Sequence, residues 1–428
     1  MRRTSLLLAA ACLTLPVVAA AAAQGKSFGG VVPDVPSGAG VPGAPIAHAA
    51  AGADVPGAPI AHAAAGAGVP GAPIARAANV PYGGGEVLHS NRTHVIFWQP
   101  TGSGLTFDAG YESLIETFLQ HVAADSHKTT NVYGLSGQYT DARRAAVYDS
   151  TYGGAVVDSD PLPASGCVGP QTGPGWTACL SDVQLELELL HVVTADRLPT
   201  TRDDIYFLVL PIGLEDCEAS GPAYCALGGG GEGSFCGYHS STPNGEPLYA
   251  VIPYNAVAGH CQSDNPRPNS STADPALSTI SHEQLEMITD PLGNAWIDGD
   301  GDEIADLCIA TFGPALGGSG AGLWNEVIAG GHYYLQEAWS NRNSACEPRA
   351  QPDSVSFTAA ARAGRRRPVS FAARARDPEG TIASYDWFFG DGHVGRGPRV
   401  SQAFRRSGAY RVSCARPTAG ETGRSTSG

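Results

Sequence analysis

Lysine, methionine and charge of either sign are scarce in this sequence of 428 residues. It contains two methionines, and only 16% of its residues are charged. Lysine occurs only as Lys26 and Lys128, so arginine carries nearly all of the positive charge. Because phosphate contacts need a basic surface, the net charge of −15 argues against a general nucleic-acid binder. The length suggests two or three domains, and the apolar fraction of 43% is ample for a sizeable core.

Several motifs that would assign a chemistry are also missing. The sequence has no G-x-S-x-G nucleophile motif and no G-x-x-x-x-G-K-[ST] phosphate loop. It has no C-x-x-C pair, which argues against a cysteine-based zinc site. Beyond the N-terminus, no stretch approaches the roughly 18 apolar residues that a membrane-spanning helix needs.

The N-terminus has the pattern of an export signal. Arg2 and Arg3 precede an apolar run that ends in small residues before Gln24. This pattern predicts a signal peptide over residues 1–23. A transmembrane anchor is the alternative, but Pro16 interrupts the run and alanine dominates it. We therefore expect a secreted protein that has no membrane contact after signal cleavage.

Cysteine usage agrees with export. Eight cysteines lie between residues 167 and 346, and an even number in an exported chain predicts four disulfides. The spacing leaves the pairing open, although Cys167 and Cys179 could close a local loop. Cys414 is left over. The eight are Cys167, Cys179, Cys217, Cys225, Cys236, Cys261, Cys308 and Cys346.

Residues 24–80 form a spacer with an internal repeat. The motif V-P-G-A-P-I-A-[HR] recurs every 14 residues, at 41–48, 55–62 and 69–76. A segment so rich in proline, glycine and alanine cannot build a packed core, so we expect it to be disordered.

The part that follows alternates between strand and helix patterns. Apolar residues have helical spacing over residues 108–124 and again after an Asp182 cap. Apolar runs at 204–211 and 248–253 predict buried strands, and residues 87–98 predict two strands joined tightly. This alternation predicts an α+β domain, in which helices pack on a sheet and disulfides stabilise the fold.

The segment 279–291 is the strongest chemical signal. An apolar stripe predicts a helix on which His282 and Glu286 share one face, with Glu283 beside them. H-E-x-x-H helices use this spacing for two metal ligands and a glutamate general base. Here the motif is H-E-x-x-E, so His282 and Glu286 are the predicted ligands and Glu283 the predicted catalytic base. This harder donor set keeps zinc possible but favours manganese, magnesium or calcium more than two histidines would.

Acidic residues about 20 positions further on supply a third ligand. The arrangement resembles the thermolysin-like zincins, in which a helical glutamate completes the site and an aspartate one turn later orients a ligand histidine. The resemblance implies a zincin-like mixed sheet, Glu303 as the third ligand and Asp306 as the orienting carboxylate. These two residues are three positions apart, not four, so this part of the match is approximate.

Two other interpretations of the segment remain open. Asp298, Asp300 and Asp302 alternate as in a D-x-D-x-D calcium loop, although Glu303 and Ile309 replace the expected glycine and glutamate. His239 and His332 could approach the metal, but we expect each to be a packed or surface histidine.

Separated motifs between residues 83 and 347 resemble the phosphate-induced protein 1/exordium family. That family consists of secreted proteins of plant and bacterial cell surfaces, and its plant members are discussed as wall and growth factors. The resemblance implies an extracellular protein and no established catalyst. Its motifs are Gly84-Gly85-Glu86-Val87-Leu88, Phe97-Trp98, Ser281-His282-Glu283, Asp290-Pro291, Asn294-Ala295-Trp296 and Glu303-Ile304-Ala305-Asp306-Leu307-Cys308.

Residues 353–414 resemble a PKD domain, through D-P-E-G-T-I-A-S-Y-D-W at 377–387 and F-G-D-G at 389–392. The resemblance implies an immunoglobulin-like β-sandwich, common in secreted bacterial proteases and polysaccharide hydrolases. After Val412 the usual last strand looks replaced, which would expose a sheet edge. Residues 415–428 are expected to be a disordered tail. A truncated or frameshifted reading frame would explain both the tail and Cys414.

These patterns predict a secreted, disulfide-stabilised protein with a metal-dependent, metallopeptidase-like site and a PKD module. Glu283 would take a proton while a peptide-like bond is hydrolysed, with zinc, manganese or calcium as the metal. The expected partner is an extracellular protein, a peptide or a cell-wall polymer. The alternative is a non-catalytic extracellular or cell-wall-associated binding protein whose metal site is structural or degenerate.

Overall fold

A computed structural model shows two compact units, which divide between Arg349 and Ala350. The predicted signal peptide, the spacer up to residue 78 and the tail from residue 416 lie outside the described residues. No helix among the described residues is long and apolar enough to cross a membrane. The structure describes residues 79–167, 176–217, 225–226, 235–257, 261, 265–350, 354–359, 367–376, 385–389, 391–405, 410 and 412–415.

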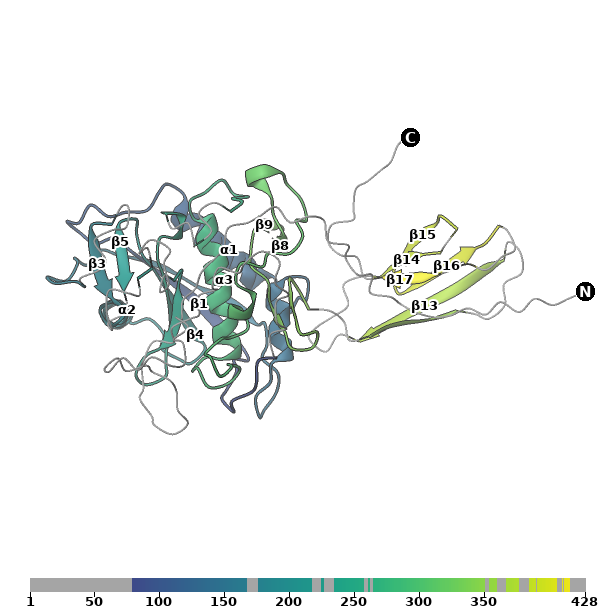
Figure 1. Cartoon of the computed structure of the whole chain (residues 1–428), viewed down its shortest axis with the longest axis horizontal. Coiled ribbons are helices and arrows are strands. Elements are labelled where there is room, and N and C mark those ends of the chain that lie inside the picture. Colours follow the sequence, from purple (N-terminus) through teal and green to yellow (C-terminus); the bar gives the residue numbers. More distant parts are fainter. Residues whose placement is uncertain are drawn as a thin grey trace, which may run out of the picture. The chain divides into compact units, whose positions relative to one another are not determined.

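A five-stranded sheet forms the centre of the larger unit (Figure 1). Four of its strands are parallel, and β6 pairs antiparallel with β7 at one edge. Because β4 and β7 are buried along their whole length, they have continuous apolar runs and not an alternating pattern. The predicted mixed sheet with helices is confirmed. In spatial order the strands are β2 (Ser150–Asp158), β1 (Asn91–Trp98), β4 (Asp204–Val209), β7 (Leu248–Ile252) and β6 (Tyr238–Ser241).

Three α-helices of the described residues are α1 (Tyr111–Ala124), α2 (Asp182–Ala195) and α3 (Asp274–Thr289). The first two agree with the helical spacing of the sequence. The cap of α2 is one residue earlier than expected, because Gln184 Oε1 accepts hydrogen bonds from the backbone N–H and the hydroxyl of Ser181. Helix α3 contacts α1, β6 and β7.

Every residue of α3 is buried. The sequence predicts this for its apolar stripe, but the polar side of the helix is covered as well. His282, Glu283 and Glu286 are at most 3% exposed. Polar groups lose hydration when they are buried and must find partners inside the protein. The partners of these polar side chains must therefore lie inside the protein, next to the polar side of α3.

The tight strand pair expected over residues 87–98 does not form. Residues 86–90 are not in a strand, and β1 instead pairs in parallel with β2 and β4. Leu88 bridges other parts of the unit, because its N–H donates to Ile288 and its carbonyl accepts from Val147. Two distant partners give β1 a hydrogen-bonded neighbour on each side, which a local hairpin could not provide.

Four disulfides join the eight cysteines of the larger unit, as predicted. The pairing was open from the sequence, and the local loop that Cys167 and Cys179 could close is among the four. Cys236, which is bonded to Cys261, lies just before β6. Cys308, which is bonded to Cys346, lies just after Asp306. The remaining pair is Cys217–Cys225.

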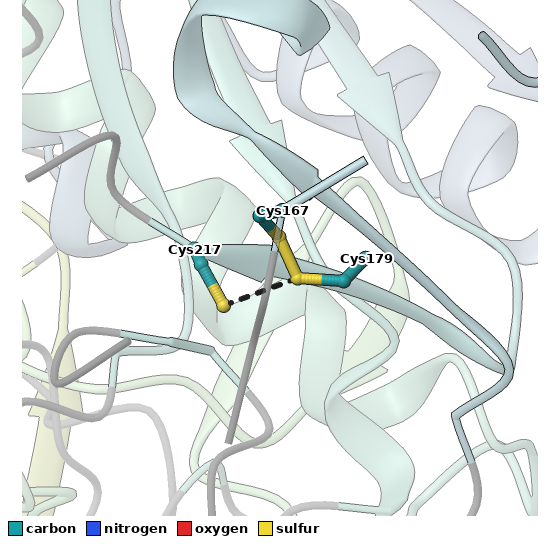
Figure 2. A group of neighbouring side chains, drawn as sticks. All are labelled: Cys167, Cys179 and Cys217. Atoms are coloured by element: carbon teal, nitrogen blue, oxygen red, sulfur yellow. Dashed lines mark hydrogen bonds between the residues drawn. A yellow bond between two sulfur atoms is a disulfide. The ribbon is translucent and has the colours of Figure 1, made fainter. Parts of the chain in front are cut away.

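Two of these disulfides touch each other. Figure 2 shows Cys217 beside the Cys167–Cys179 bond, with 3.4 Å between the Sγ atoms of Cys179 and Cys217. The contact arises because β3 (Ala178–Ser181) and β5 (Leu214–Cys217) pair in parallel. Each sulfur already belongs to a disulfide, and only thiolates bind metals, so this group is not a metal site. Short β8–β9 (Glu326–Ile328, Gly331–Tyr333) and β10–β11 (Ala338–Ser340, Ala345–Glu347) pairs complete the unit.

The smaller unit has two three-stranded antiparallel sheets, as a β-sandwich requires. One core joins both sheets, with Phe357 and Phe371 from the first and Trp387 from the second. The first sheet contains β12 (Ser354–Ala359), β13 (Pro368–Arg376) and β16 (Arg399–Ala403), and the second contains β15 (Val394–Arg396), β14 (Asp386–Phe388) and β17 (Ser413–Ala415).

Strand β17 corrects the expectation that the last strand of this unit is missing. It pairs with β14, with Trp387 opposite Cys414. Val412 and Cys414 are both buried in the core. Two inward side chains and backbone pairing are enough to form a short strand, although the sequence lacks a longer alternating pattern there.

Candidate metal centre

Three segments of the larger unit bring six titratable side chains together in its interior. Helix α3 contributes three of them, the edge strand β6 one, and the loop after residue 302 two. All six are at most 6% exposed, so water does not screen their charges as it would at the surface. They are His239, His282, Glu283, Glu286, Glu303 and Asp306. We call them the α3 cluster.

His282 and Glu286 are in direct contact, as their spacing of four on a helix requires. Nε2 of His282 lies 3.0 Å from Oε2 of Glu286. The other carboxylate oxygen of Glu286 accepts the backbone N–H groups of Ala305 and Asp306, both at 3.1 Å. The helix and the acidic loop that follows it are therefore fixed to each other by the carboxylate of one predicted ligand.

Asp306 lies on the same side of the His282 ring as Glu286. Its Oδ1 is 3.3 Å from Nε2 of His282, and its Oδ2 accepts the backbone N–H of Glu303 at 2.9 Å. The opposite ring nitrogen, Nδ1, is 3.4 Å from Nε2 of Gln336. A carboxylate that orients a ligand histidine contacts the nitrogen turned away from the metal. In the structure Gln336 takes that place, and Asp306 lies where a ligand would.

His239 completes the cluster from the sheet side. Its Nδ1 lies 3.2 Å from Glu283 and 3.8 Å from Glu286, and its Nε2 lies 3.6 Å from Glu303. We expected this histidine to be an ordinary packed or surface residue. It has no motif around it, and only the position of β6 at the sheet edge brings it to α3. His332, the other histidine considered, is exposed on β9 and stacks on Trp324.

Gly237 allows β6 to approach α3 this closely. A Cβ atom on Gly237 would lie 2.6 Å from Cγ2 of Thr279 and 3.3 Å from Oε1 of Glu283. The first distance is shorter than any carbon–carbon contact that packed side chains tolerate. A glycine two residues before His239 is therefore part of how the cluster is assembled.

The electrostatics of the α3 cluster favour a bound cation. Burial raises the pKa of Glu303 well above its usual range, and the charges of Glu286 and its neighbours raise it further. For His282, burial lowers the pKa, but the charges of Glu286 and Glu283 outweigh burial and raise it well above its usual value. In their ionised forms the four carboxylates outnumber the two imidazoles. A cation would relieve this excess of buried negative charge.

The donor geometry also fits a metal ion. Ligand bonds of about 2.0–2.2 Å place neighbouring ligand atoms roughly 3–3.6 Å apart. Two overlapping groups each bring three ligand atoms within 4.8 Å of one another, and Glu286 belongs to both. A mixed nitrogen and carboxylate donor set suits zinc or manganese. The two groups are His282–Glu286–Asp306 and His239–Glu283–Glu286.

The remaining predicted site residues lie at or beyond the margin of these groups. Glu303 contacts His239 but belongs to neither group of three. In the possible calcium loop, Oδ1 of Asp298 accepts the backbone N–H groups of Asp300 and Asp302. Among the described residues, the carboxylates of these three aspartates do not form a group with ligand spacing.

Comparison with known proteins identifies one part of the chain. The family model of the PKD domain matches residues 349–426. Residues 349–426 are a PKD domain. Its two small sheets and shared core are those of the PKD β-sandwich predicted from the sequence.

The chain is also similar to Protein EXORDIUM-like 3 of Arabidopsis thaliana. The two are 36% identical over 86 residues, which is 17% of this chain and 26% of the relative. The chain thus matches about a quarter of the length of this curated relative. Both resemblances seen in the sequence, to the PKD domain and to the exordium-like proteins, are confirmed. No solved structure matches the chain.

Proposed function

We propose that this chain is an extracellular metal-dependent hydrolase of the metallopeptidase type, with a zincin-like larger unit and an accessory PKD domain. The PKD domain, the disulfides and the exordium-like relative fit an extracellular protein. The observation that carries the proposal is the convergence of two histidines and four carboxylates from α3, β6 and the loop after residue 302, away from solvent and with five of the six at ligand spacing.

In this proposal His282, Glu286 and Asp306 hold the metal, and zinc or manganese fits their donor atoms best. A bound divalent metal supplies Lewis acidity, which polarises a carbonyl and makes water more acidic. Glu283 is the general base, because it follows His282 in sequence and its group of three shares Glu286 with the group that holds the metal. The imidazole of His239, 3.2 Å away, orients this carboxylate and stabilises its charge.

The position of β6 supports a peptide-like substrate. It is the edge strand of the sheet and carries His239 next to Glu283. Extended peptides commonly bind by adding to the edge of a sheet, where main-chain hydrogen bonds hold them in line. We therefore expect a peptide, protein or peptide-containing cell-wall polymer to bind at this edge.

Burial favours one alternative. Every member of the α3 cluster is at most 6% exposed, whereas a catalytic metal needs an open position for water and substrate. Closed sites of this kind are typical of structural metals. The second candidate is therefore a non-catalytic extracellular or cell-wall-associated binding protein in which the metal stabilises the fold.

Metal analysis and two matched variants separate these candidates. Purified wild-type protein should contain one equivalent of zinc or manganese, Glu286→Gln should lose it, and Asp300→Asn, which removes a nearby exposed carboxylate, should retain it. Glu283→Gln should keep the metal while hydrolysis of a peptide and peptidoglycan panel falls by roughly 10²-fold or more, as expected when a general base is lost. Bound metal without any hydrolysis would support the structural candidate. A wild type that binds no metal would refute both.

A further inference from the structure

A second group of carboxylates lies at the end of β2, and none of its members belongs to the α3 cluster. Asp158 is the last residue of that strand, Asp160 follows in the loop, and Glu188 comes from α2. One ligand oxygen from each lies within 4.8 Å of the other two. Acidic groups are often close together at protein surfaces, so proximity alone does not indicate a site.

Asp158 is buried and only partly satisfied. It is 7% exposed, and its Oδ1 accepts the backbone N–H of Asp160 at 2.9 Å. Its Oδ2 has no hydrogen-bond partner among the described residues. A buried carboxylate oxygen without a donor loses hydration for no return, unless a shared proton or a bound cation satisfies it.

The loop that carries this group is fixed in place. The backbone N–H of Gln99 donates to the carbonyl of Asp158 at 2.8 Å, and Nε1 of Trp98 donates to the carbonyl of Asp160 at 2.9 Å. The hydroxyl of Thr101 donates to the carbonyl of Ser159 at 2.6 Å. These bonds hold the backbone from which the carboxylates of Asp158 and Asp160 project.

The carboxylates of Asp158 and Glu188 lie side by side, and two ionised carboxylates cannot donate to each other. Such a pair needs either a shared proton or a cation between its members. Burial raises the pKa of Glu188 to about 7, and the charges of Asp158 and Asp160 contribute. His191, whose side chain is largely exposed, contacts Asp160 at 3.0 Å.

We propose that Asp158, Asp160 and Glu188 bind a calcium ion that ties the end of β2 to α2. All three donors are carboxylates, which calcium prefers over nitrogen ligands. A shared proton would satisfy one pair of oxygens, whereas a cation satisfies all three carboxylates at once. A partly exposed site with three protein carboxylates is expected to bind calcium with a Kd of roughly 10⁻⁴–10⁻³ M, as extracellular calcium modules do.

The test is a calcium titration of the full-length purified protein. Calorimetry measures the calcium affinity, and thermal unfolding measures the midpoint of the larger unit. The variants are Glu188→Gln and, as a control, Asp196→Asn, which removes an exposed carboxylate at the end of the same helix. Glu286→Gln keeps the two metal sites distinguishable. Wild type, Asp196→Asn and Glu286→Gln should bind calcium with the same affinity, and Glu188→Gln should bind it at least tenfold more weakly.

The order of stabilities gives an independent readout that does not require the variant to bind anything. Without calcium, Glu188→Gln should melt at a higher temperature than wild type, because repulsion within the group is relieved. With 5 mM calcium the order should reverse. If calcium leaves the wild-type midpoint unchanged, or raises it equally in Glu188→Gln, the group is held by a shared proton and the calcium site is refuted.

Discussion

The close approach of β6 to α3 leads to a sharp prediction for Gly237→Ala. The added Cβ would lie 2.6 Å from Cγ2 of Thr279 and 3.1 Å from the carbonyl oxygen of Val251. Neither the backbone of β7 nor the body of α3 can easily yield, so β6 must shift. Overpacking of this kind costs about 1–3 kcal/mol of unfolding free energy. The shift also moves His239 away from Glu283, the proposed general base, so hydrolysis should fall together with stability.

A compensating change on the facing helix tests whether the contact is the cause. Thr279→Ser removes Cγ2 but keeps the hydroxyl that accepts a hydrogen bond from Asn255 at 2.6 Å. Alone it should cost about 0.8 kcal/mol, the value of one buried methyl group. In Gly237→Ala/Thr279→Ser the shortest contact, 2.6 Å to Cγ2, is gone, so the double variant should be more stable than Gly237→Ala alone.

Chemical denaturation of the four proteins measures this double-mutant cycle, and hydrolysis of the peptide panel by the same samples measures activity. We expect a coupling free energy of at least about 1 kcal/mol in the stabilising direction. Additive effects, or a Gly237→Ala protein as stable as wild type, would show that β6 does not depend on a side-chain-free position here.

Three further predictions concern other parts of the chain. Burial raises the pKa of Asp204, but its contacts with Arg92, Thr201 and His94 outweigh burial and lower it to about 2. The stability it contributes is thus complete above pH 4 and lost as the pH falls towards 2. Asp204→Asn should therefore lower the unfolding free energy by about 2 kcal/mol at pH 7, a value discounted for the half-exposed Arg92. In urea denaturation its unfolding free energy should also change less between pH 4 and pH 2 than that of wild type. Chelation with EDTA should lower the thermal midpoint of the larger unit, and added zinc should restore it; an unchanged midpoint would contradict the α3 metal centre. Trp387→Ala should cost the PKD domain about 3–5 kcal/mol and leave the melting of the larger unit unchanged in calorimetry; a shift of both transitions would contradict independent cores.

Sequence patterns predicted the helices and strands that depend on the periodicity of neighbouring residues. Helix α3 and the shared face of His282 and Glu286 follow from a period of 3.6 residues, and β4 and β7 follow from apolar runs. The hairpin expected at residues 87–98 does not form, because β1 takes both of its partners from distant segments. Periodicity reports which residues are in a strand, but it does not report which strands pair.

The candidate site likewise has a part that the sequence predicts and a part that it does not. The sequence placed Glu286 and the acidic loop after residue 302 near each other through a family resemblance, and the structure brings them into contact. His239 lies 43 residues before His282, on a strand of four residues, so no spacing rule connects the two. Its place in the cluster comes from the crossover that puts β6 at the edge of the sheet. The pairing of the cysteines was open for the same reason, since it depends on the finished fold.

Two disulfides lie next to residues of the α3 cluster, so the cluster depends on the oxidation state of the chain. One bond begins three residues before His239, and another begins two residues after Asp306. Both ends of the ligand set are therefore braced by links that form only in an oxidising compartment. A reduced chain has neither brace, so we expect the proposed ion to bind only after these disulfides have formed.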